Sequence, residues 1–500
     1  MVMKMAFKRG LIVVLGVLLQ VFLYMFLYLY LGEHIAIINI FYYLIGIVII
    51  LELIRDSKSY SYTLPWIVII LLFPVVGSLL YLIIGTSKRR SKTLKNIKEA
   101  EKEYRKYYVT DKKLINEIKD KSHLKYLTDY SKFALYDNSN VSYYPLGEEV
   151  YKEMLKELKQ AKKFIFIEYF IISTGSMWNS ILSILEEKVK GGVEVRVIYD
   201  DLGCLKTLPN NYNEVLESKG IKCIVFNPLK PSRGFIMNNR DHRKILVIDG
   251  NVAFSGGINL SDEYINLNKR FGHWKDNGIK ITGDAVWSYT IMFLTIWNAY
   301  IKEDKDFTRY KYEFKDSKKT GYVLPYSETP LDDEVTSEDV YINIISRANN
   351  YLYIFTPYLV LDTDLINSLV LASKRGVDVR IVIPGIPDKK IVYSLSESYI
   401  EPLMKGGVKV YKYTPGFVHA KVFVSDDKVA TVGTINLDYR SLYLNFECGL
   451  YMEEIATIKD IKKDLEDTIS KSKLVSNKEG VPKLAKAVWQ AILRLIAPLM

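Results

Sequence analysis

The sequence predicts an α/β protein of two similar halves, related by a pseudo-twofold duplication and preceded by N-terminal transmembrane helices. Three observations lead to this prediction. The motif His-x-Lys-x-x-x-x-Asp occurs near the middle of the chain and again 177 residues later. A strand–helix–strand pattern recurs in both halves, and the first ninety residues contain three long apolar stretches. Such self-similarity indicates an internal duplication, and alternating strands and helices indicate α/β folding.

The apolar stretches come first along the chain. Leu11–Leu31 and Ser59–Ser87 are long enough to span a bilayer, and Ile35–Leu51 is nearly so. Basic residues before the first stretch favour an N-terminus inside the cell, while the basic run at 88–92 favours an inside body. Three full crossings cannot satisfy both, so either one segment is re-entrant or interfacial, or the N-terminus lies outside. We therefore predict a membrane-anchoring segment over residues 1–90 with two to three apolar helices.

The net charge of +11 is concentrated beside apolar segments. Residues 1–92 contribute +6 and residues 478–500 contribute +3, which leaves +2 for the 385 residues between them. A nucleic-acid-binding protein usually carries its basic excess on its folded domain, whereas this distribution is expected at an anionic lipid surface. We therefore expect anionic membrane lipid, and no nucleic acid, as a partner. The oligomeric state stays unknown from the sequence.

The elements after the anchor follow in order. Residues 91–140 are rich in Lys and Glu and predict a solvated, charged juxtamembrane helix or linker. Two α/β domains are then predicted over 141–318 and 319–480, and the polar residues at 304–338 suggest a loop-like joint between them. The predicted strands are Phe164–Ile167 and Val193–Tyr199 in the first half, and Tyr351–Phe355 and Val377–Ile383 in the second.

The last segment, residues 481–500, predicts an amphipathic C-terminal helix. Leu484, Val488, Ile492 and Leu495 recur at helical spacing, with basic residues nearby. The same stripe is typical both of a helix lying on a membrane and of a terminal helix packed on the body. The sequence favours neither alternative.

Each copy of the motif lies on a predicted strand that leads into a hairpin. Residues i and i+2 of a strand share a face, so the His and Lys of each copy project together. The Asp has an odd offset from the His, so we expect it to face the other way and brace the hairpin. If the halves pack about a pseudo-twofold axis, both His–Lys pairs converge on one site. The candidate catalytic residues are His242, Lys244 and Asp249 in the first half and His419, Lys421 and Asp426 in the second.

This set of side chains suits chemistry on an anionic phosphodiester. A neutral imidazole attacks phosphorus without charge repulsion and forms a phosphohistidine, while a second imidazolium gives the leaving alkoxide a proton. The lysines, with Asn259 and Asn436 ten residues past each motif Asp, would bind the phosphate oxygens. Asp276 and Glu447 are the candidate carboxylates that orient the imidazoles.

The remaining histidines and the cysteines indicate no further chemistry. His34, His123 and His273 are interpreted as structural. The three cysteines are scattered, which predicts buried thiols in a cytosol-facing body. Lysine is not a usual metal ligand and no cluster of His, Cys and carboxylates stands close to the motifs, so we expect neither a metal nor another cofactor.

The residues around both motifs resemble the phospholipase D superfamily and, within it, the bacterial cardiolipin synthases. The resemblance covers about residue 62 to the C-terminus. The chain departs from the family pattern by its third apolar stretch and by Gly278, where the family commonly has His. The resemblance is carried by Leu64–Gly85, Glu168–Phe170, Asn239–Lys244, Gly256–Asn259, Thr356–Tyr358, Gly416–Lys421, Gly433–Ser441 and Asn445–Glu447.

The resemblance implies two phospholipase D-like sandwich halves that carry out a two-step phosphatidyl transfer. One phosphatidylglycerol would phosphatidylate a histidine and release glycerol, and a hydroxyl of a second would then attack to yield cardiolipin. By analogy, His242 is the nucleophile and His419 the general acid and then base, without a cofactor. The implied location is the bacterial cell membrane, with several crossings and a cytoplasmic catalytic body.

Two other functions stay open at this point. One is the same chemistry with another acceptor, either a phospholipase D-type hydrolase or a phosphatidyltransferase using a different alcohol. The other is a membrane scaffold or lipid-binding protein with vestigial motifs. A nuclease is disfavoured by the near-neutral body and the membrane anchor. The acceptor and the acyl-chain preference are not set by the sequence.

Overall fold

The computed structural model divides the chain into two compact units, which are described separately. The smaller unit comprises residues 1–91, 231–236 and 491–500, and the larger comprises residues 92–230 and 237–490. The residues that the structure describes are 22, 35–55, 60–82, 92–118, 121–228, 239–314, 318–476 and 484–499.

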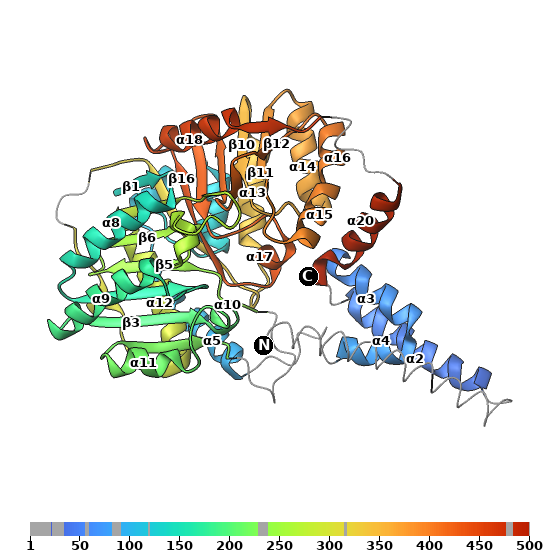
Figure 1. Cartoon of the computed structure of the whole chain (residues 1–500), viewed down its shortest axis with the longest axis horizontal. Helices are drawn as coiled ribbons and strands as arrows, with labels where there is room; N and C mark the ends of the chain where they lie inside the picture. Colours follow the sequence, from blue (N-terminus) through green and yellow to red (C-terminus); the bar gives the residue numbers. More distant parts are fainter. Residues whose placement is uncertain are drawn as a thin grey trace. The chain divides into compact units, whose positions relative to one another are not determined.

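The described residues of the smaller unit include α2 (Ile35–Arg55), α3 (Tyr60–Leu72) and α4 (Pro74–Leu80), which contact one another (Figure 1). The break between α3 and α4 falls at Pro74, which lacks a backbone N–H and occupies the first turn of α4, where no intrahelical hydrogen bond is lost. Among the described residues, no helix combines the length and the apolar character that a bilayer crossing requires. The predicted transmembrane helices are therefore not confirmed, and the first of them lies, apart from Phe22, outside the described residues.

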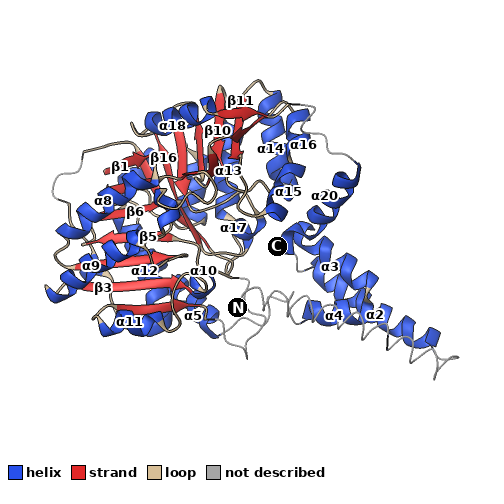
Figure 2. Ribbon diagram, in the orientation of Figure 1, coloured by secondary structure: helices blue, strands red, loops and turns tan. Residues whose placement is uncertain are grey.

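The larger unit contains two mixed sheets with matching strand order, drawn as red arrows in Figure 2. The first sheet has the order β1-β8-β6-β5-β2-β3-β4. The second has the order β9-β16-β15-β14-β10-β11-β12, with β17 added beyond β12. The prediction of two duplicated α/β halves is thus confirmed. In the first half, β2 pairs in parallel with β3 and antiparallel with β5, which starts at Lys244. In the second half, β10 pairs in parallel with β11 and antiparallel with β14, which starts just after Lys421.

The strands and helices of the first half surround a core of buried apolar residues. Its strands are β1 (Ser139–Tyr144), β2 (Phe164–Tyr169), β3 (Glu194–Asp200), β4 (Lys222–Phe226), β5 (Lys244–Ile248), β6 (Val252–Gly256), β7 (His273–Lys275) and β8 (Gly278–Gly283). Its helices are α8 (Gly147–Gln160), α9 (Ser176–Lys190), α10 (Asp201–Cys204), α11 (Tyr212–Ser218) and α12 (Val286–Ile301), with the short η5 (Asp262–Ile265).

The second half repeats this arrangement with additional helices after its third strand. Its strands are β9 (Tyr322–Glu328), β10 (Tyr351–Phe355), β11 (Asp378–Pro384), β12 (Lys409–Tyr413), β13 (Gly416–Val418), β14 (Val422–Ser425), β15 (Val429–Gly433), β16 (Glu447–Glu453) and β17 (Ser472–Leu474). Its helices are α13 (Thr336–Arg347), α14 (Thr363–Lys374), α15 (Lys390–Ser398), α16 (Ile400–Lys405), α17 (Tyr439–Tyr443), α18 (Ile458–Ser470) and α20 (Leu484–Ile496).

Helix α12 joins the two halves. Its residues from Val286 to Ala299 are all buried, and it contacts β2 and β5 of the first sheet and β9 of the second. A helix that is apolar on all sides belongs in a protein interior, which explains why α12 shows no amphipathic stripe. The two sheets are therefore held in one body, and a site between them has a rigid frame.

Two expectations about the connecting segments were wrong. Residues 92–104 form α5 (Lys92–Tyr104), which buries Leu94 and Ile97 and contacts α12, so this helix is solvated on one face only. The segment 304–338 is more than a loop, because it contains β9, the buried edge strand that pairs with β16. In both cases, tertiary packing buries the few apolar residues of a mostly polar stretch.

Candidate active site

The two histidines lie where the halves meet, each just before a strand. The backbone N–H of His242 donates to the carbonyl of Phe446 (N···O 2.8 Å), and that of His419 donates to the carbonyl of Lys275 (2.7 Å). The second contact continues the parallel pairing of β13 with β7, and the first continues a parallel bridge between Asp241 and Phe446. Each histidine is thus held in place by a segment from the opposite half.

The same crossing brings the two candidate carboxylates to the imidazoles. Nδ1 of His242 lies 2.8 Å from Oε2 of Glu447, and Nδ1 of His419 lies 2.7 Å from Oδ2 of Asp276. Both carboxylates are fully buried. Glu447 follows Phe446 and Asp276 follows Lys275 in the sequence. The segment that accepts the backbone hydrogen bond of each histidine therefore also supplies the carboxylate for its imidazole. The exchange between halves is reciprocal.

These contacts set the protonation of the imidazoles. A carboxylate that accepts a hydrogen bond from Nδ1–H leaves Nε2 as the basic atom. Burial lowers the pKa of His242 to about 4 and that of His419 to about 3, although the carboxylates oppose this shift. Both imidazoles are therefore neutral near pH 7 before substrate binds. Burial also raises the pKa of Asp276 and Glu447, but the adjacent histidines outweigh it, so both acids stay ionised.

The two lysines add positive charge to the same cluster. Nζ of Lys244 donates to the backbone carbonyl of His242 (2.7 Å), and Nζ of Lys421 does the same to His419 and also lies 3.2 Å from its Nε2. Burial lowers the pKa of Lys421 to about 7 and that of Lys244 to about 8. Lys421 in turn lowers the pKa of His242, and Lys244 that of His419, so the charges of the two halves act on one another. This mutual influence supports the predicted convergence.

The predicted asparagines are buried beside the motifs and have corresponding hydroxyl partners. Nδ2 of Asn259 donates to the hydroxyl of Tyr264 (2.7 Å), and Nδ2 of Asn436 donates to that of Ser441 (3.1 Å). Oδ1 of Asn259 also accepts from the backbone N–H of Ile171, whereas Oδ1 of Asn436 has no hydrogen-bond partner in the described part of the chain. Only the second amide therefore retains an unused polar atom.

The two motif aspartates are not brought to the imidazoles, which corrects their assignment as catalytic residues. Each lies at the far end of its strand, seven residues past the histidine, in a turn with positive φ. The carboxylate of Asp249 accepts from the backbone N–H groups of Lys162, Lys163 and Phe164. The carboxylate of Asp426 accepts from those of Asn349, Asn350 and Tyr351 in the same manner. They brace the hairpins, as their odd offset indicated.

Sequence reasoning missed Gly257 and Thr434, which occupy the same position two residues before each asparagine. The hydroxyl of Thr434 donates to Oε2 of Glu447 (2.5 Å). A Cβ on Gly257 would lie 1.9 Å from Oδ1 of Asp276, so only glycine permits that carboxylate to approach. A signal for both residues was present in the sequence, because each lies at the same distance from the histidine of its own copy of the motif.

A buried arginine between His242 and Lys244 also escaped prediction. Arg243 points to the other face of its strand, where it pairs with Glu168 (2.8 Å) and Asp241 (3.1 Å). All three side chains are at most 4% exposed. Breaking one member of such a buried set leaves an uncompensated charge, so this group anchors the segment that carries His242.

The surroundings of the two imidazoles differ. The ring of His419 lies among those of Trp274, Tyr264 and Phe417, at centroid distances of 5.3, 5.4 and 6.0 Å. The ring of His242 packs edge-on against Phe170 at 4.9 Å. The two histidines are therefore chemically distinct despite the duplication, which a division of catalytic roles requires.

The other described histidines have structural partners. Nε2 of His123 lies 2.7 Å from Glu453, and Nδ1 of His273 lies 3.0 Å from the hydroxyl of Tyr413. His34 lies outside the described residues. Cys204 and Cys448 are buried, and burial raises the pKa of Cys448 to about 11.

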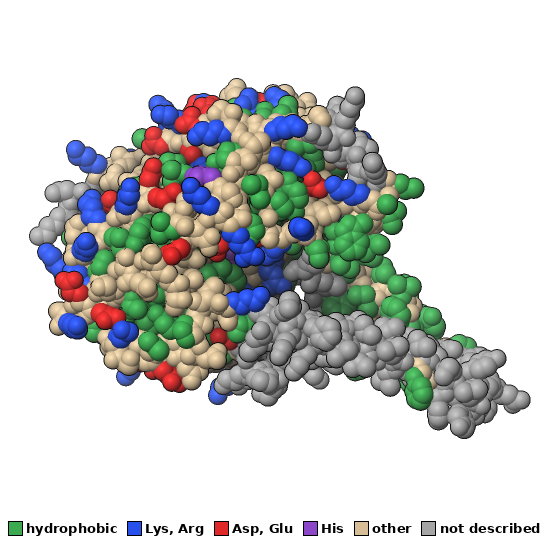
Figure 3. Space-filling view, viewed as in Figure 1, with side chains coloured by type: hydrophobic (Ala, Val, Ile, Leu, Met, Phe, Trp, Pro, Cys, Tyr) green, Lys and Arg blue, Asp and Glu red, His purple; other side chains and the backbone are tan. Residues whose placement is uncertain are grey.

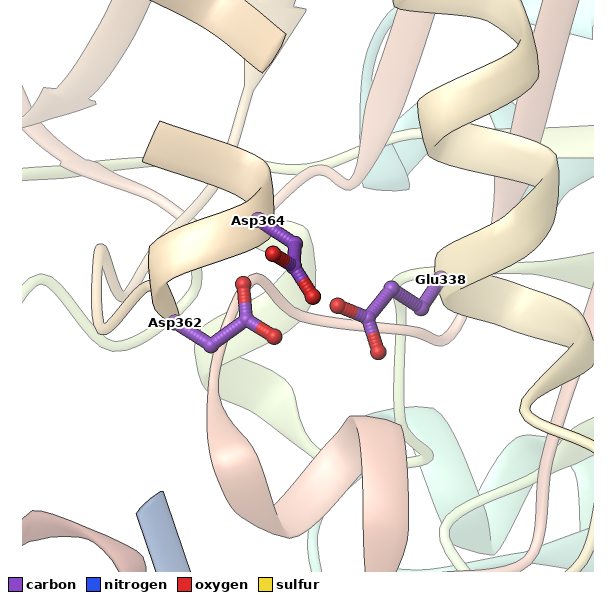
Figure 4. Close-up of side chains that lie close together, drawn as sticks. All are labelled: Glu338, Asp362 and Asp364. Atoms are coloured by element: carbon purple, nitrogen blue, oxygen red, sulfur yellow. The ribbon is translucent and has the colours of Figure 1, made fainter. Parts of the chain in front are cut away.

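One cluster of carboxylates in the described residues has the composition of a metal site. Figure 4 shows Glu338 at the start of α13 and Asp362 and Asp364 at the start of α14 pointing toward one another. The hydroxyl of Tyr443 lies 2.7 Å from Glu338 and 2.9 Å from Asp362. Burial and the neighbouring Asp362 raise the pKa of Glu338 to about 8, so a retained proton relieves the charge repulsion. The cluster is accounted for without a cation.

Two family models match the chain. A model described as the phospholipase D-like domain of cardiolipin synthase matches twice, over residues 154–278 and 341–469. A model described as the phospholipase D-nuclease N-terminal region matches residues 40–85. The first match covers β2 to β7 and the second covers β10 to β16.

Similar proteins cover nearly the whole chain. An uncharacterized protein of Streptococcus mutans is 45% identical and covers 90% of this chain and 99% of its own. Cardiolipin synthase 1 of Staphylococcus aureus is 32% identical, over 94% of this chain and 98% of that protein. The crystal structure of phosphatidylserine synthase from Haemophilus influenzae superposes with a TM-score of 0.55 at 15% identity, over 72% of this chain and 93% of that one, which shows a shared fold.

Proposed function

The chain belongs to the cardiolipin synthase family with phospholipase D-like domains, and on this premise we propose that it transfers a phosphatidyl group between two phosphatidylglycerol molecules. The products are cardiolipin and glycerol. One observation carries the proposal: each buried imidazole is paired through Nδ1 with a carboxylate from the opposite half. This arrangement gives two neutral, oriented bases beside two lysines.

In the first step, Nε2 of His242 attacks the phosphorus of one phosphatidylglycerol. A P–N bond forms, the P–O bond to glycerol breaks, and the leaving alkoxide takes a proton from Nε2 of His419. The anionic phosphate raises the pKa of the nearby histidine, so His419 becomes protonated when substrate binds. Glu447 stabilises the positive charge that develops on His242, and the lysines bind the phosphate oxygens.

In the second step, a hydroxyl of another phosphatidylglycerol attacks the phosphohistidine. Nε2 of His419, now neutral, removes the proton from this hydroxyl, and the P–N bond breaks as the new P–O bond forms. His242 returns to its starting state, and His419 holds the proton for the next cycle. His419 thus gives up one proton and recovers one over a complete turnover, while His242 forms and breaks the P–N bond.

The positions of the lysines support the proposed role of His242 as nucleophile. Nζ of Lys421 lies 3.2 Å from Nε2 of His419, the only ring nitrogen that is left to attack, so an ammonium group there would hinder attack on phosphorus. Nζ of Lys244 contacts the backbone carbonyl of His242 instead. These contacts favour proton exchange at His419 and attack by His242.

We further propose that the smaller unit embeds in the bacterial cell membrane, crosses it more than once and leaves the larger unit in the cytoplasm. Helix α2 exposes large apolar side chains, among them Phe41 (61%), Val48 (64%) and Leu51 (62%). The match of the N-terminal family model to residues 40–85 falls on the same helices. Lipid is the solvent that such a surface requires.

The test is lipid analysis of vesicles that contain phosphatidylglycerol and the purified full-length chain. Cardiolipin and glycerol should form in equal amounts, while His242→Ala and His419→Ala should each lower the rate by at least about a thousandfold. A radiolabelled phosphatidyl group should stay attached to the His419→Ala protein and not to His242→Ala. Phosphatidic acid as the main product would show a hydrolase, and unchanged rates in both variants would show vestigial motifs.

A further inference from the structure

Two loops beside His419 expose apolar side chains among basic ones. The first loop follows η5 and the second connects β11 to α15. We call the following six exposed residues the rim: Leu267, Lys269 and Arg270 in the first loop, Ile386 and Lys389 in the second, and Ile391 in the first turn of α15. Leu267 is 63% exposed, Ile391 54% and Ile386 40%, which is uncommon for large aliphatic residues in three adjacent places.

The two loops come from opposite halves but lie side by side. The carbonyl of Gly416 accepts hydrogen bonds from the backbone N–H groups of Gly385 and Ile386, at 3.0 and 3.1 Å. Gly416 also pairs with His273, which ends the first loop. A Cβ on Gly272 would lie 3.0 Å from Cδ1 of Ile386, so the loops are in direct contact. The rim is therefore one surface.

A layer of aromatic rings connects the rim to the candidate active site. The guanidinium of Arg270 lies 5.0 Å from the ring of Phe271, and Nζ of Lys389 lies 5.2 Å from the ring of Tyr358. Both rings pack on Phe417, at 6.3 and 6.4 Å, and Phe417 lies 6.0 Å from His419. The exposed residues are thus separated from this imidazole by about two side chains.

The charge of the rim is positive. Lys269, Arg270 and Lys389 are exposed, whereas the nearby acids Glu263 and Asp388 are only partly exposed. Asp388 is engaged by Tyr358 at 2.7 Å and lies 3.9 Å from Lys389. Figure 3 shows hydrophobic and basic side chains side by side over α15 and its neighbours. Aliphatic residues interspersed with Lys and Arg are typical of a surface that enters the headgroup region of anionic lipid.

Helix α20 extends the same character along α15. Lys486 pairs with Glu397 (2.8 Å), and the amide of Gln490 donates to the carbonyl of Ser394 (3.0 Å), so the first turns of α20 lie along α15. Leu484 is 82% exposed and Val488 55%. An apolar stripe thus borders the rim on a helix that is already held by polar contacts on its other side.

We propose that the rim docks on an anionic lipid bilayer, so that a phospholipid headgroup reaches His419 while its acyl chains stay in the membrane. This inference rests on the proposed function, because a phospholipid substrate would otherwise have to be extracted whole into water. Removing two acyl chains from a bilayer exposes their entire apolar surface. An enzyme that acts on such a substrate avoids this cost if its active site meets the headgroups at the membrane surface.

The docking is tested by fluorescence quenching with the full-length chain in vesicles. An environment-sensitive fluorophore is attached to Leu267→Cys or Ile391→Cys, in a background whose three native cysteines are replaced by alanine. The matched control is Val215→Cys on α11, which is 40% exposed and lies in the first half. Spin-labelled lipids should quench the two rim labels at least about threefold more than the control in vesicles rich in phosphatidylglycerol, and less in phosphatidylcholine alone. Quenching equal to the control, or equal in both vesicle types, would overturn the proposal.

A second measurement separates docking from catalysis. The double variant Leu267→Glu/Ile391→Glu should lower cardiolipin formation from vesicle phosphatidylglycerol by about tenfold or more. Docking would bring the two introduced negative charges against anionic lipid. Turnover of a short-chain phosphatidylglycerol dispersed as monomers should be retained, and Val215→Glu should retain both. Equal losses on both substrates would refute a docking role. Quenching of the rim labels without any cardiolipin formation would leave docking in place and reject the proposed function.

Discussion

Nδ1 of His242 lies 2.8 Å from Oε2 of Glu447, although the two residues are 205 positions apart and belong to different halves. Its counterpart joins His419 to Asp276 across 143 positions. Because each contact crosses between the halves, neither half forms an oriented imidazole by itself. The two halves therefore constitute a single catalytic unit, because each half needs the other to orient its imidazole.

Glu447→Gln should lower kcat by roughly 10²–10⁴-fold with little change in folding. The amide keeps the size of the side chain but does not stabilise the imidazolium that forms on His242, and it no longer selects the Nδ1–H tautomer. Steady-state rates on phosphatidylglycerol measure the effect. Asp276→Asn should produce a loss of the same kind through His419. The matched control is Glu454→Gln, an exposed glutamate that should keep the full rate.

The rate should decline as pH rises through the pKa values of the two lysines. Burial lowers these to about 7 for Lys421 and about 8 for Lys244, so rising pH removes the charges that bind phosphate. The decline should occur at lower pH in kcat/KM, which reports the free enzyme, than in kcat, since bound anionic substrate raises both pKa values. Lys421→Arg should shift the decline upward, because arginine stays charged. Lys405→Arg, at an exposed position, should leave the profile unchanged, and an unshifted decline in Lys421→Arg would exclude Lys421 as its origin.

The two asparagines should differ when each is replaced by alanine. Asn259→Ala removes the partners of the Ile171 N–H and the Tyr264 hydroxyl and should lower the free energy of unfolding by roughly 1–3 kcal/mol. Asn436→Ala loses a single contact to Ser441 and should instead lower kcat by roughly 10²-fold, since Nδ2 keeps a second N–H that can donate to a phosphate oxygen. Denaturation midpoints and rates are measured on both variants. A larger stability loss in Asn436→Ala, or a larger rate loss in Asn259→Ala, would contradict the prediction.

Asp249→Ala should reduce stability and leave the chemistry of the folded protein intact. Three backbone N–H groups lose their acceptor, and because they are partly exposed we expect a loss of roughly 1–2 kcal/mol. Asp249→Asn should recover much of it, since asparagine tolerates positive φ and keeps an acceptor oxygen. Thermal denaturation with rates normalised to folded protein checks both variants. A thousandfold loss of rate at unchanged stability would restore Asp249 to the catalytic residues.

Much of the site was predictable because its geometry is local. His242 and Lys244 share a strand face, and the turn after Ile248 places Asp249 at the opposite end of the strand. Such relations depend only on strand periodicity, which every strand obeys. The alternation of apolar runs likewise predicted β2, β3, β10 and β11 close to their observed positions.

Other features depend on contacts that no local pattern encodes. The aromatic rings around His419 come from Tyr264 and Trp274 of the opposite half as well as from Phe417. The role of Thr434 follows from Glu447, which lies on another strand. Likewise β9 was hidden in a polar segment, because pairing with β16 and burial by the second half stabilise it.

The sequence alone determined the duplicated motif, the strand faces and hence the phosphodiester chemistry, since these follow from residue type and from the two-residue period of a strand. Only the tertiary structure decided which carboxylate serves which histidine and that the two imidazoles differ. The reason is physical: tautomer and pKa are set by burial and by neighbours through space, and here the decisive neighbours are 143 and 205 residues away along the chain.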